Sequence, residues 1–393
     1  MGFIHVSDLH LGCWRDQKLE RMQIQKFNEL IDFSIRSNAE FLLIAGDLFE
    51  TPIPRIDIIK TVVDNFKKLK ENNIPVFYIA GSHDYSPSGK TILNVLESAD
   101  LCKSLEIIDD KNNLHGIEYK DYYLVGISGR SRSTEIDLFK KLNIQKKPGK
   151  KNIFVFHTSI TDFFKFDGIF IADLPEGFDY YAGSHVHINK EFINEKIIIF
   201  PGCFFPHVFD ELWEEVGYYY YVDLEKKDFK KIKTLEKVIE KIFLEGTFTS
   251  EQLNKLLLEE ISKRNLNEKI VLIKIKGVLK KGSKLSDINF KQILEFAQSK
   301  NAYLVLRNTT GLAKEEFETI YVEKRNEEEI IRDLLKENLS KSCINLTEEE
   351  HLRMLKDLFE ILSSKKEQDI TTQQFETNLI LNFEDYIKKK FGI

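Results

Sequence analysis

The stretch GFIHVSDLHLG, residues 2–12, decides the fold expected for the N-terminal half of the chain. It joins a short apolar segment, Gly2–Val6, to the triplet Asp8-Leu9-His10. A short apolar run that ends in a polar turn is typical of a buried strand. The same arrangement recurs at several later points, so the residues that follow each apolar segment are the first candidates for chemistry.

Short apolar segments and amphipathic helical patterns alternate through the first part of the chain. Further strands are expected at Phe41–Ala45, Val76–Ala80, Tyr122–Ser128, Ile153–His157, Tyr180–Ala182, Ile197–Phe200 and Tyr218–Val222. Helices are expected at Lys18–Arg36 and Ile56–Lys70. This alternation predicts an α/β layered domain. The closely spaced strands after about His115 predict a second, more antiparallel sheet packed on the first.

The rest of the chain divides into two further parts. The lysine-rich stretch Lys226–Lys241 is expected to be a connection. The segments that predict a small α+β unit after it are Ser250–Ile261 (helix), Ile270–Val278 (strand), Asn289–Lys300 (helix) and Ala302–Arg307 (strand). From Glu323 the pattern is helical, and its first apolar stripe is Ile331, Leu334 and Leu335. We therefore expect domains at residues 1–228, 229–315 and 316–393.

The composition limits the class of protein. At 42% hydrophobic residues the chain can bury a substantial core, and its length of 393 residues suggests two or three domains. The net charge of −6 excludes a uniformly basic nucleic-acid-binding protein, but it permits a local basic face. No apolar run is long enough to span a membrane. Four cysteines without a CxxC pair and an N-terminus unlike a secretory signal favour a cytoplasmic, prokaryotic-type setting.

Aspartate and histidine residues gather where predicted strands end. The groups are Asp8 with His10, Asp47 in Gly46-Asp47, the segment Gly81-Ser82-His83-Asp84, His157, and His185 with His187. Loops at the carboxyl ends of strands line one crevice of an open α/β sheet. Imidazole and carboxylate together suit manganese, iron or zinc. One bridging carboxylate can hold two cations about 3.5–4 Å apart, which is an arrangement that hydrolyses phosphate esters.

A single histidine or aspartate after a strand is more often a cap or a satisfied surface group than a ligand. His5, His115, His207 and His351 are assigned that structural role here. The ordered series D-x-H, G-D, G-x-H-D, H and H-x-H, each at a strand end, is far more specific than any one of its parts. It predicts a two-metal phosphoesterase.

This ordered series resembles the pattern of the calcineurin-like metallophosphoesterase superfamily over roughly the first half of the chain. The segments SDLHLG (residues 7–12) and AGDLF (residues 45–49) are similar to those of the archaeal-like SbcD/Mre-eleven nucleases, as are Tyr180-Tyr181-Ala182 and Pro201-Gly202. The resemblance implies a two-sheet α/β/β/α sandwich over residues 1–228. It also implies a small α+β capping domain that contacts DNA over residues 229–315, and a linker with a helical tail over 316–393.

The resemblance implies a role for each residue at a matching position. The implied ligands are Asp8, His10 and His187 for the first metal, Asp47 between the metals, and Ser82, His157 and His185 for the second. His83 is implied to lie near the scissile phosphate, where it donates a proton or stabilises the transition state. The family uses manganese, two ions per subunit.

The chain departs from the family pattern at three positions. Ser82 replaces an asparagine whose amide oxygen binds the second metal, so a weaker second site is expected. Ser184 replaces a glycine before the final His-x-His. Glu50 replaces a histidine that follows the GDLF segment and is expected near the substrate.

Basic residues near the motifs are candidate contacts for DNA phosphates, which position DNA without reading its sequence. They are Arg15, Lys18, Arg55, Arg130 and Arg132. Apolar residues in the expected helices Ile56–Lys70 and Thr91–Leu101 indicate packing against the sheet. The resemblance implies that these two helices also form a symmetric homodimer.

The helical tail carries a second apolar stripe behind a Thr347-x-x-Glu350 capping box. Its members are Leu352, Leu355, Leu358, Phe359 and Leu362. The resemblance implies that this stripe binds the coiled coil of an SbcC-type (Rad-fifty-like) ABC ATPase. The alternative is that it packs back on the protein itself. The chain has no P-loop motif of its own.

The function that these observations favour is a manganese-dependent DNA nuclease, with 3′–5′ exonuclease and single-strand endonuclease action, that processes DNA ends in double-strand-break repair. A small-molecule phosphodiesterase of the same superfamily is one alternative. A DNA-bridging scaffold whose site is weakened at Ser82 is the other.

Overall fold

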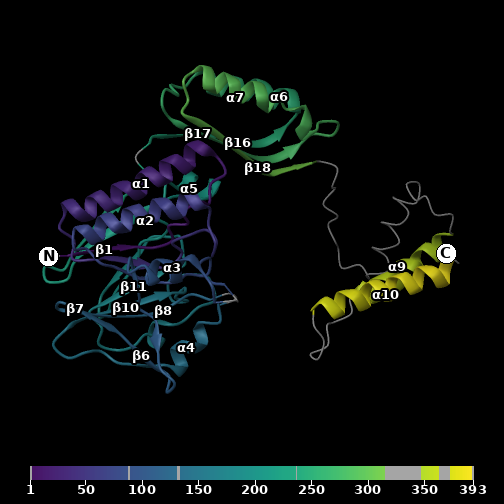
Figure 1. The fold of residues 1–393 in the computed structure, drawn as a ribbon. Coiled ribbons are helices and arrows are strands. Elements are labelled where there is room, and N and C mark those ends of the chain that lie inside the picture. The colour runs from purple at the N-terminus through teal and green to yellow at the C-terminus, as the bar shows by residue number, and fades with distance from the viewer. Residues whose placement is uncertain are drawn as a thin grey trace. The chain divides into compact units, whose positions relative to one another are not determined.

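The computed structural model describes residues 2–86, 89–130, 133–235, 237–314, 347–362 and 372–391. The chain forms two compact units, Met1–Glu315 and Glu316–Ile393 (Figure 1). The predicted stripe at Ile331, Leu334 and Leu335 lies outside the described residues.

The first unit begins with a six-stranded sheet in the order β15-β14-β1-β2-β3-β4. Its strands are β1 (Phe3–Val6), β2 (Leu42–Ala45), β3 (Val76–Ile79), β4 (Lys103–Ser104), β14 (Tyr218–Asp223) and β15 (Asp228–Lys233). Strands β1 to β4 are parallel, whereas β14 and β15 are antiparallel to their neighbours. The carboxyl ends of β1, β2 and β3 therefore meet at one edge, where three of the predicted motifs follow.

Helices provide the crossovers that parallel strands require. They are α1 (Gln17–Arg36), α2 (Ile56–Glu71) and α3 (Ile92–Ser98). Helix α1 begins where the Asp16 carboxylate accepts hydrogen bonds from the Lys18 and Leu19 amides. Helices α1 and α2 lie side by side along the sheet and bury apolar faces that include Phe27 and Phe66.

The second sheet has the order β12-β13-β11-β10-β8-β7. Its strands are β7 (Ile117–Tyr119), β8 (Tyr122–Ile127), β10 (Lys151–His157), β11 (Tyr180–Ser184), β12 (Lys190–Ile193) and β13 (Ile197–Phe200). The prediction that the second sheet is more antiparallel than the first is wrong, because its four central strands are parallel and only its two edge pairs are antiparallel, so both sheets have the same number of antiparallel pairs. Helix α4 (Ile136–Lys141) and a 3₁₀ turn (Ile171–Asp173) lie in the connections between parallel strands.

Aromatic side chains fill the space between the two sheets. The Phe3 ring stacks on Phe41 at 4.7 Å, and Phe41 meets the edge of Tyr122 from the second sheet at 5.1 Å. Separate apolar clusters cover the outer faces, with Phe66 of α2 on one side and Phe139 of α4 on the other. The predicted α/β/β/α sandwich is confirmed. A small sheet of β5 (Ile107–Ile108), β6 (Asn113–His115) and β9 (Asn143–Ile144) adjoins it.

The stretch Lys226–Lys241 is not simply a connection. It contains β15 and the start of β16 (Ile239–Phe248), so the first sheet continues past residue 228. Phe229 and Ile232 are three residues apart in β15, so they point to opposite faces of the strand and pack on two different buried clusters. The lysines between and beside them are exposed, as is typical of an edge strand.

The following α+β unit has a sheet in the order β16-β17-β18, with β17 at Ile270–Leu279 and β18 at Leu304–Lys314. All three strands are parallel. Helices α6 (Ser250–Ser262) and α7 (Phe290–Ser299) lie together on one face and bury Leu257 and Ile293 in a separate core. Lys274 of β17 pairs with Asp210 of α5 (Phe209–Glu214) at 2.7 Å.

The described part of the second unit consists of α9 (Glu348–Leu362) and α10 (Thr372–Phe391). The capping box before α9 forms as the sequence predicts, since the Glu350 amide donates to Thr347 Oγ1 and the Thr347 amide donates to the Glu350 carboxylate. The Tyr386 hydroxyl joins α10 to Asp357 of α9 at 2.9 Å. Among the described helices, none is both long and apolar enough to cross a membrane.

Candidate metal centre

Four of the predicted ligands have left-handed backbone conformations, which non-glycine residues seldom adopt. Their φ angles are 49° at Asp8, 45° at His10, 49° at Asp47 and 86° at His185. Each such residue costs about 1–3 kcal/mol, and residues of this kind cluster at functional sites. Backbone hydrogen bonds hold the first two loops together, from the Asp8 amide to the Gly46 carbonyl and from the His10 amide to the Asp47 carbonyl.

Three imidazole rings are oriented by partners behind them. His10 Nδ1 lies 2.9 Å from Glu50 Oε2, and His187 Nδ1 lies 2.7 Å from Glu211 Oε1. His157 Nδ1 lies 3.2 Å from the Ala45 carbonyl oxygen. A neutral ring that donates through Nδ1 leaves a lone pair on Nε2. Metal-binding histidines are typically held by this kind of outer hydrogen bond.

The Nε2 atoms of these rings converge with carboxylate oxygens. His10 Nε2 is 3.3 Å from His187 Nε2 and 3.6 Å from Asp47 Oδ2. His157 Nε2 is buried without a hydrogen-bond partner, 3.2 Å from Asp47 Oδ2. Nitrogen and oxygen atoms that converge at these distances can bind one cation between them. The donor set of imidazole and carboxylate therefore fits divalent transition metals.

Asp47 is the electrostatic centre of the group. Burial raises its pKa, but the charges of His157 and His10 outweigh burial and hold it well below its usual range. Burial likewise lowers the pKa of His157, and the Asp47 charge overcomes this and raises it to about 9. Metal binding at His157 Nε2 would therefore release a proton.

The second half of the predicted constellation lies close by. The His185 amide donates to Asp8 Oδ1 at 3.2 Å, and the His185 ring is 5.1 Å from the His157 ring. Ser184 is fully buried, and its hydroxyl lies 2.9 Å from His157 Nδ1. The serine in place of the family's glycine is thus accommodated as a polar partner of a candidate ligand. Ser82 is half-buried, and no hydrogen bond of its hydroxyl joins it to the described residues.

His83 stands at the open side of the cluster. Its side chain is 44% exposed, and its ring centre is 4.6 Å from that of His10. Its amide donates to Asp47 Oδ1 at 2.8 Å, and its Nδ1 lies 3.0 Å from the Glu50 carbonyl oxygen. The ring is therefore held through Nδ1, and Nε2 is left for a substrate.

Asp84 ties the loops after β2 and β3 together. It is buried, and its carboxylate accepts hydrogen bonds from the Leu48 amide at 3.1 Å, the Phe49 amide at 3.0 Å and the Gly81 amide at 3.1 Å. Burial and the charge of Asp47 raise the pKa of Asp84 to about 7. Asp84 thereby positions candidate ligands without facing the metal.

Asp84→Ala is expected to lower the free energy of unfolding by about 3 kcal/mol or more, because each buried amide left without an acceptor costs about 1–3 kcal/mol. Asp84→Asn keeps one acceptor oxygen and should lose less. Urea unfolding measures both, with the exposed Asp110→Ala as the matched control. An Asp84→Ala midpoint equal to that of the unmodified protein would mean that the amides find other partners.

His207, to which the sequence alone assigned an ordinary structural role, lies beside the cluster. Its ring centre lies 4.7 Å from that of His10 and 4.5 Å from that of His187. The sequence signal was weak, since His207 follows no strand directly. A His207-x-x-x-Glu211 pair soon after Pro201-Gly202 could have drawn attention to it. His5, by contrast, is a core residue whose Nδ1 contacts the Tyr180 hydroxyl at 2.8 Å, while its Nε2 is buried without a hydrogen-bond partner.

The candidate DNA contacts differ in their surroundings. Arg55 pairs with Glu20 and Asp57, and Lys18 donates to the Tyr303 carbonyl oxygen. Arg130 lies 3.4 Å from Glu106. Arg15 is exposed and has no ion pair within the described part of the chain, while Arg132 lies outside that part.

Residues 1–189 match the family model described as calcineurin-like phosphoesterase. Several proteins named DNA double-strand break repair protein Mre11 are similar to about half of the chain. The one from Sulfolobus acidocaldarius is 33% identical over 200 residues, 49% of this chain and 50% of that protein. Those from Methanococcus maripaludis and Archaeoglobus fulgidus are 32% and 30% identical, over 48% and 51% of this chain and 52% and 49% of their own.

The chain thus spans about half the length of the curated relatives that it matches. The matched region contains every candidate ligand from Asp8 to His187, and His207 lies beyond the family model. The chain is therefore similar to calcineurin-like phosphoesterases over its first 189 residues, and to proteins named Mre11 over about half of its length.

Proposed function

We propose that this protein is a manganese-dependent DNA nuclease that processes DNA ends in double-strand-break repair, with 3′–5′ exonuclease and single-strand endonuclease action. The observation that carries the proposal is the convergence of the Nε2 atoms of His10 and His157 on the Asp47 carboxylate. His187 Nε2 lies beside them, 3.3 Å from His10 Nε2 and 3.7 Å from Asp8 Oδ1. The relatives named as DNA double-strand break repair proteins support DNA as the substrate.

The proposed ligands divide between two positions around Asp47. Asp8, His10 and His187 form one set, and Ser82, His157 and His185 form the other, with Asp47 shared. Two divalent cations bound there would supply a nucleophile at neutral pH and neutralise the charge of a phosphodiester. The protein contributes fixed donors, since the outer hydrogen bonds of the imidazoles set their orientation in advance.

His83 is proposed to act on the substrate itself. Its Nδ1 is engaged with the Glu50 carbonyl, so its exposed Nε2 is free to donate a hydrogen bond or a proton to a phosphate oxygen. Glu50 occupies the position of the family's substrate-side histidine, but its carboxylate faces His10 instead. We infer that Glu50 orients the proposed ligand His10, and that His83 contacts the substrate.

DNA would approach across the phosphoesterase domain, proposed at residues 1–228, and the capping domain, proposed at 229–315. Arg15, Lys18, Arg55, Arg130 and Arg132 are the proposed phosphate contacts. Arg55 and Arg130 form ion pairs with carboxylates, and Lys18 donates a hydrogen bond to Tyr303 of the proposed capping domain. Among the described residues of this set, Arg15 is the one without such a partner.

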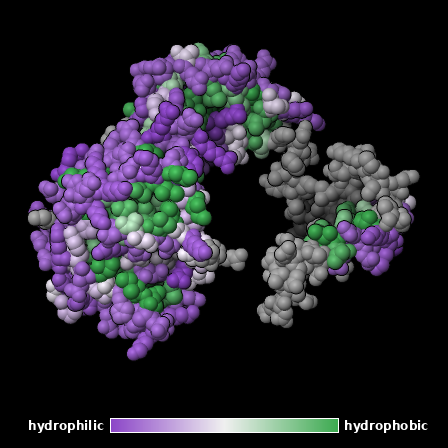
Figure 2. Space-filling view, in the orientation of Figure 1, coloured by the Kyte–Doolittle hydropathy of each residue, from purple (hydrophilic) through white to green (hydrophobic). Residues whose placement is uncertain are grey.

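A homodimer is proposed through the surface near α2 and α3. Figure 2 shows hydrophobic surface over the region where these helices lie in Figure 1. Ile53, Ile56 and Val95 are 78%, 84% and 59% exposed. Exposed apolar residues that lie close together are typical of an association surface. A symmetric contact of this kind would place two active sites on one DNA molecule.

The test of the proposed function is cleavage of labelled single- and double-stranded DNA with manganese, magnesium or a chelator. We expect cleavage with manganese, and faster cleavage at low manganese by Ser82→Asn, because an amide oxygen is a better neutral ligand than a short hydroxyl. We expect Ser82→Asn to bind manganese about tenfold more tightly at the second site, which corresponds to about 1.4 kcal/mol from the added ligand.

Three other results would point elsewhere. Cleavage by Ser82→Asn alone would favour a DNA-bridging scaffold with a weakened site. Hydrolysis of small phosphodiesters without DNA cleavage, with the partner ATPase present, would favour a small-molecule phosphodiesterase. Cleavage that persists in the presence of a chelator would show that the reaction does not depend on a bound metal ion, and the metal-dependent mechanism would be wrong.

A further inference from the structure

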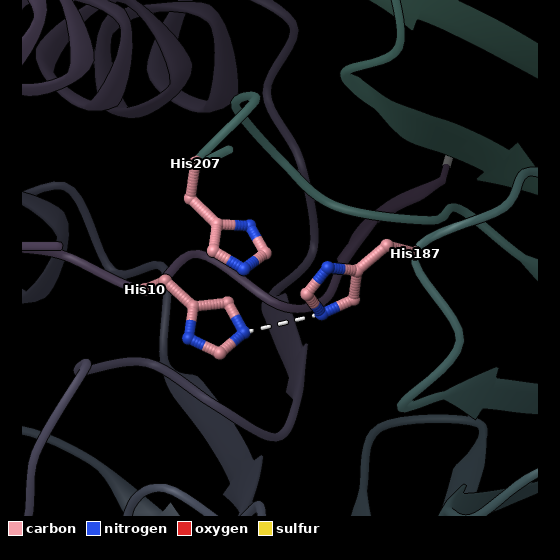
Figure 3. Close-up of side chains that lie close together, drawn as sticks. All are labelled: His10, His187 and His207. Atoms are coloured by element: carbon pink, nitrogen blue, oxygen red, sulfur yellow. Dashed lines mark hydrogen bonds between the residues drawn. The ribbon is translucent and has the colours of Figure 1, made fainter. Parts of the chain in front are cut away.

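Three imidazole rings, rather than two, face one another on the first-metal side of the cluster. Figure 3 shows His10, His187 and His207 turned toward a common space. One nitrogen of each ring lies within 4.8 Å of the nitrogens of the other two. The ring of His207 comes from the loop before α5, while His10 and His187 follow strands of the two different sheets.

The ring separations match those of imidazoles that share one metal ion. A metal–nitrogen bond of about 2.1 Å places the ring centre roughly 3.2 Å from the ion, so two rings about 90° apart have centres roughly 4.6 Å apart. The observed separations are 4.7 Å for His10 and His207, 4.5 Å for His187 and His207, and 5.0 Å for His10 and His187. All three pairs therefore fit a single ion.

Glu211 holds His207 in the way that metal-binding histidines are held. Its Oε1 is 2.7 Å from His187 Nδ1, and its Oε2 is 2.8 Å from both His207 Nδ1 and the His207 amide nitrogen. The Glu211 carboxylate thus hydrogen-bonds to His187 Nδ1 and to the His207 amide, and it lies at ion-pair distance from His207 Nδ1 without hydrogen-bond geometry. The Nε2 atom of His207 is left as the donor, as in His10 and His187.

We propose that His207 is a direct ligand of the first metal, which it shares with His10, His187 and the carboxylates of Asp8 and Asp47. The inference rests on the proposed function only in requiring a metal at this position. A third imidazole shifts the preference of the site away from magnesium and toward later transition metals such as cobalt and zinc, because imidazole suits these metals better. The first site is then the tighter one, and the site near Ser82 the weaker.

The test measures binding of cobalt(II) and manganese(II) to the full-length chain without DNA. His207→Asn is the decisive variant, because its amide can replace Nδ1 opposite Glu211 but has no atom at the position of Nε2. Calorimetry is expected to show a loss of at least about tenfold in affinity at the tight site for both His207→Asn and His207→Ala. The visible spectrum of cobalt should change as an imidazole is lost. His207→Gln, which restores an oxygen near Nε2, should recover part of the affinity.

His115→Ala is the matched control, since His115 pairs with Asp109 at 3.0 Å outside the cluster. Circular dichroism and the melting temperature without metal establish that each variant is folded. If folded His207→Asn binds both metals with unchanged affinity and spectrum, His207 only positions Glu211, and the inference is wrong. If the unmodified chain binds no metal at all, both the inference and the proposed function are wrong. If the unmodified chain binds metal, His207→Asn weakens that binding and the unmodified chain cleaves no DNA, the inference stands and only the nuclease proposal is wrong.

Discussion

Asp47→Asn is expected to abolish tight binding of both metals and with it metal-dependent cleavage. Asp47 lies 3.2 Å from His157 Nε2 and 3.6 Å from His10 Nε2, and it is almost fully buried. Removing one member of a buried charged pair costs about 3–5 kcal/mol. In metal affinity this corresponds to a loss on the order of a hundredfold to several thousandfold.

The substitution keeps the size and the local hydrogen bonds of the side chain. Asparagine retains one oxygen, which can still accept from the His83 amide as Oδ1 does at 2.8 Å. The loop after β2 should therefore keep its shape while the shared negative charge disappears. Calorimetric titration with manganese and initial rates of DNA cleavage measure the two losses separately.

Asp109→Asn is the matched control for this change. Asp109 also pairs with a histidine, His115, but this pair is 35% and 55% exposed and lies outside the cluster. It should leave manganese binding and cleavage unchanged. If Asp47→Asn bound two manganese equivalents as tightly as the unmodified chain, the shared-carboxylate arrangement would be refuted.

The positions of most candidate ligands could be predicted because they depend on local features of the sequence. Each apolar segment is short and ends in a glycine or a polar triplet, so strand ends are visible without knowledge of the fold. The parallel order of β1, β2 and β3 then brings Asp8, Asp47 and His83 to one edge of the sheet. The capping box before α9 is equally local, and it was predicted correctly.

The features that could not be predicted depend on contacts between distant residues. His207 lies near His10 in space although almost the whole sequence of the domain separates them. No local pattern distinguishes His207 from a histidine that caps a helix. The parallel centre of the second sheet was missed because one crossover contains only the short α4 and another only a 3₁₀ turn, which leave no long helical pattern. The edge strand β15 was missed because it is rich in lysine and its two apolar residues, Phe229 and Ile232, do not follow the period of two that predicts a strand.

The hydrogen bonds that hold the Nδ1 atoms of the proposed ligands could not be predicted from the sequence either. Glu50 and Glu211 stand behind His10 and His187, at 2.9 Å and 2.7 Å. Glu50 was noted only as a departure from the family pattern. In the structure, the same departure supplies a carboxylate to a proposed ligand, which increases the basicity of that imidazole. A substitution that a motif comparison counts as a loss therefore has a definite structural role.

Leu362→Asp is expected to prevent the chain from binding the coiled coil of its proposed ATPase partner. Leu362 ends α9 and is 63% exposed, and Ile380, Leu381 and Phe383 of α10 are 58%, 55% and 41% exposed. Figure 2 shows hydrophobic surface on these described helices. Leu355 and Leu358 of the predicted stripe are half-buried, while the side chains of Leu352 and Phe359 lie outside those described.

An aspartate in place of Leu362 would be buried without a partner in the proposed complex. The expected loss is at least about 2 kcal/mol, roughly thirtyfold in the dissociation constant. Because Leu362 is exposed, the same change should leave the folding of the free chain and its hydrolysis of small phosphodiesters intact. Val238→Asp, at a site 61% exposed in the first unit, is the matched control and should bind the ATPase normally.

Deleting residues 323–393 provides a second measurement, because it removes the stripe whatever each side chain contributes. The truncated chain should fail to co-purify with the ATPase and still hydrolyse small phosphodiesters, since all the candidate ligands lie within Met1–Glu315. If Leu362→Asp and the deletion both left the complex intact, the partner would bind elsewhere. If the deletion also removed the hydrolysis, the tail would be part of the fold of the enzyme, and its apolar stripe would pack on the protein itself.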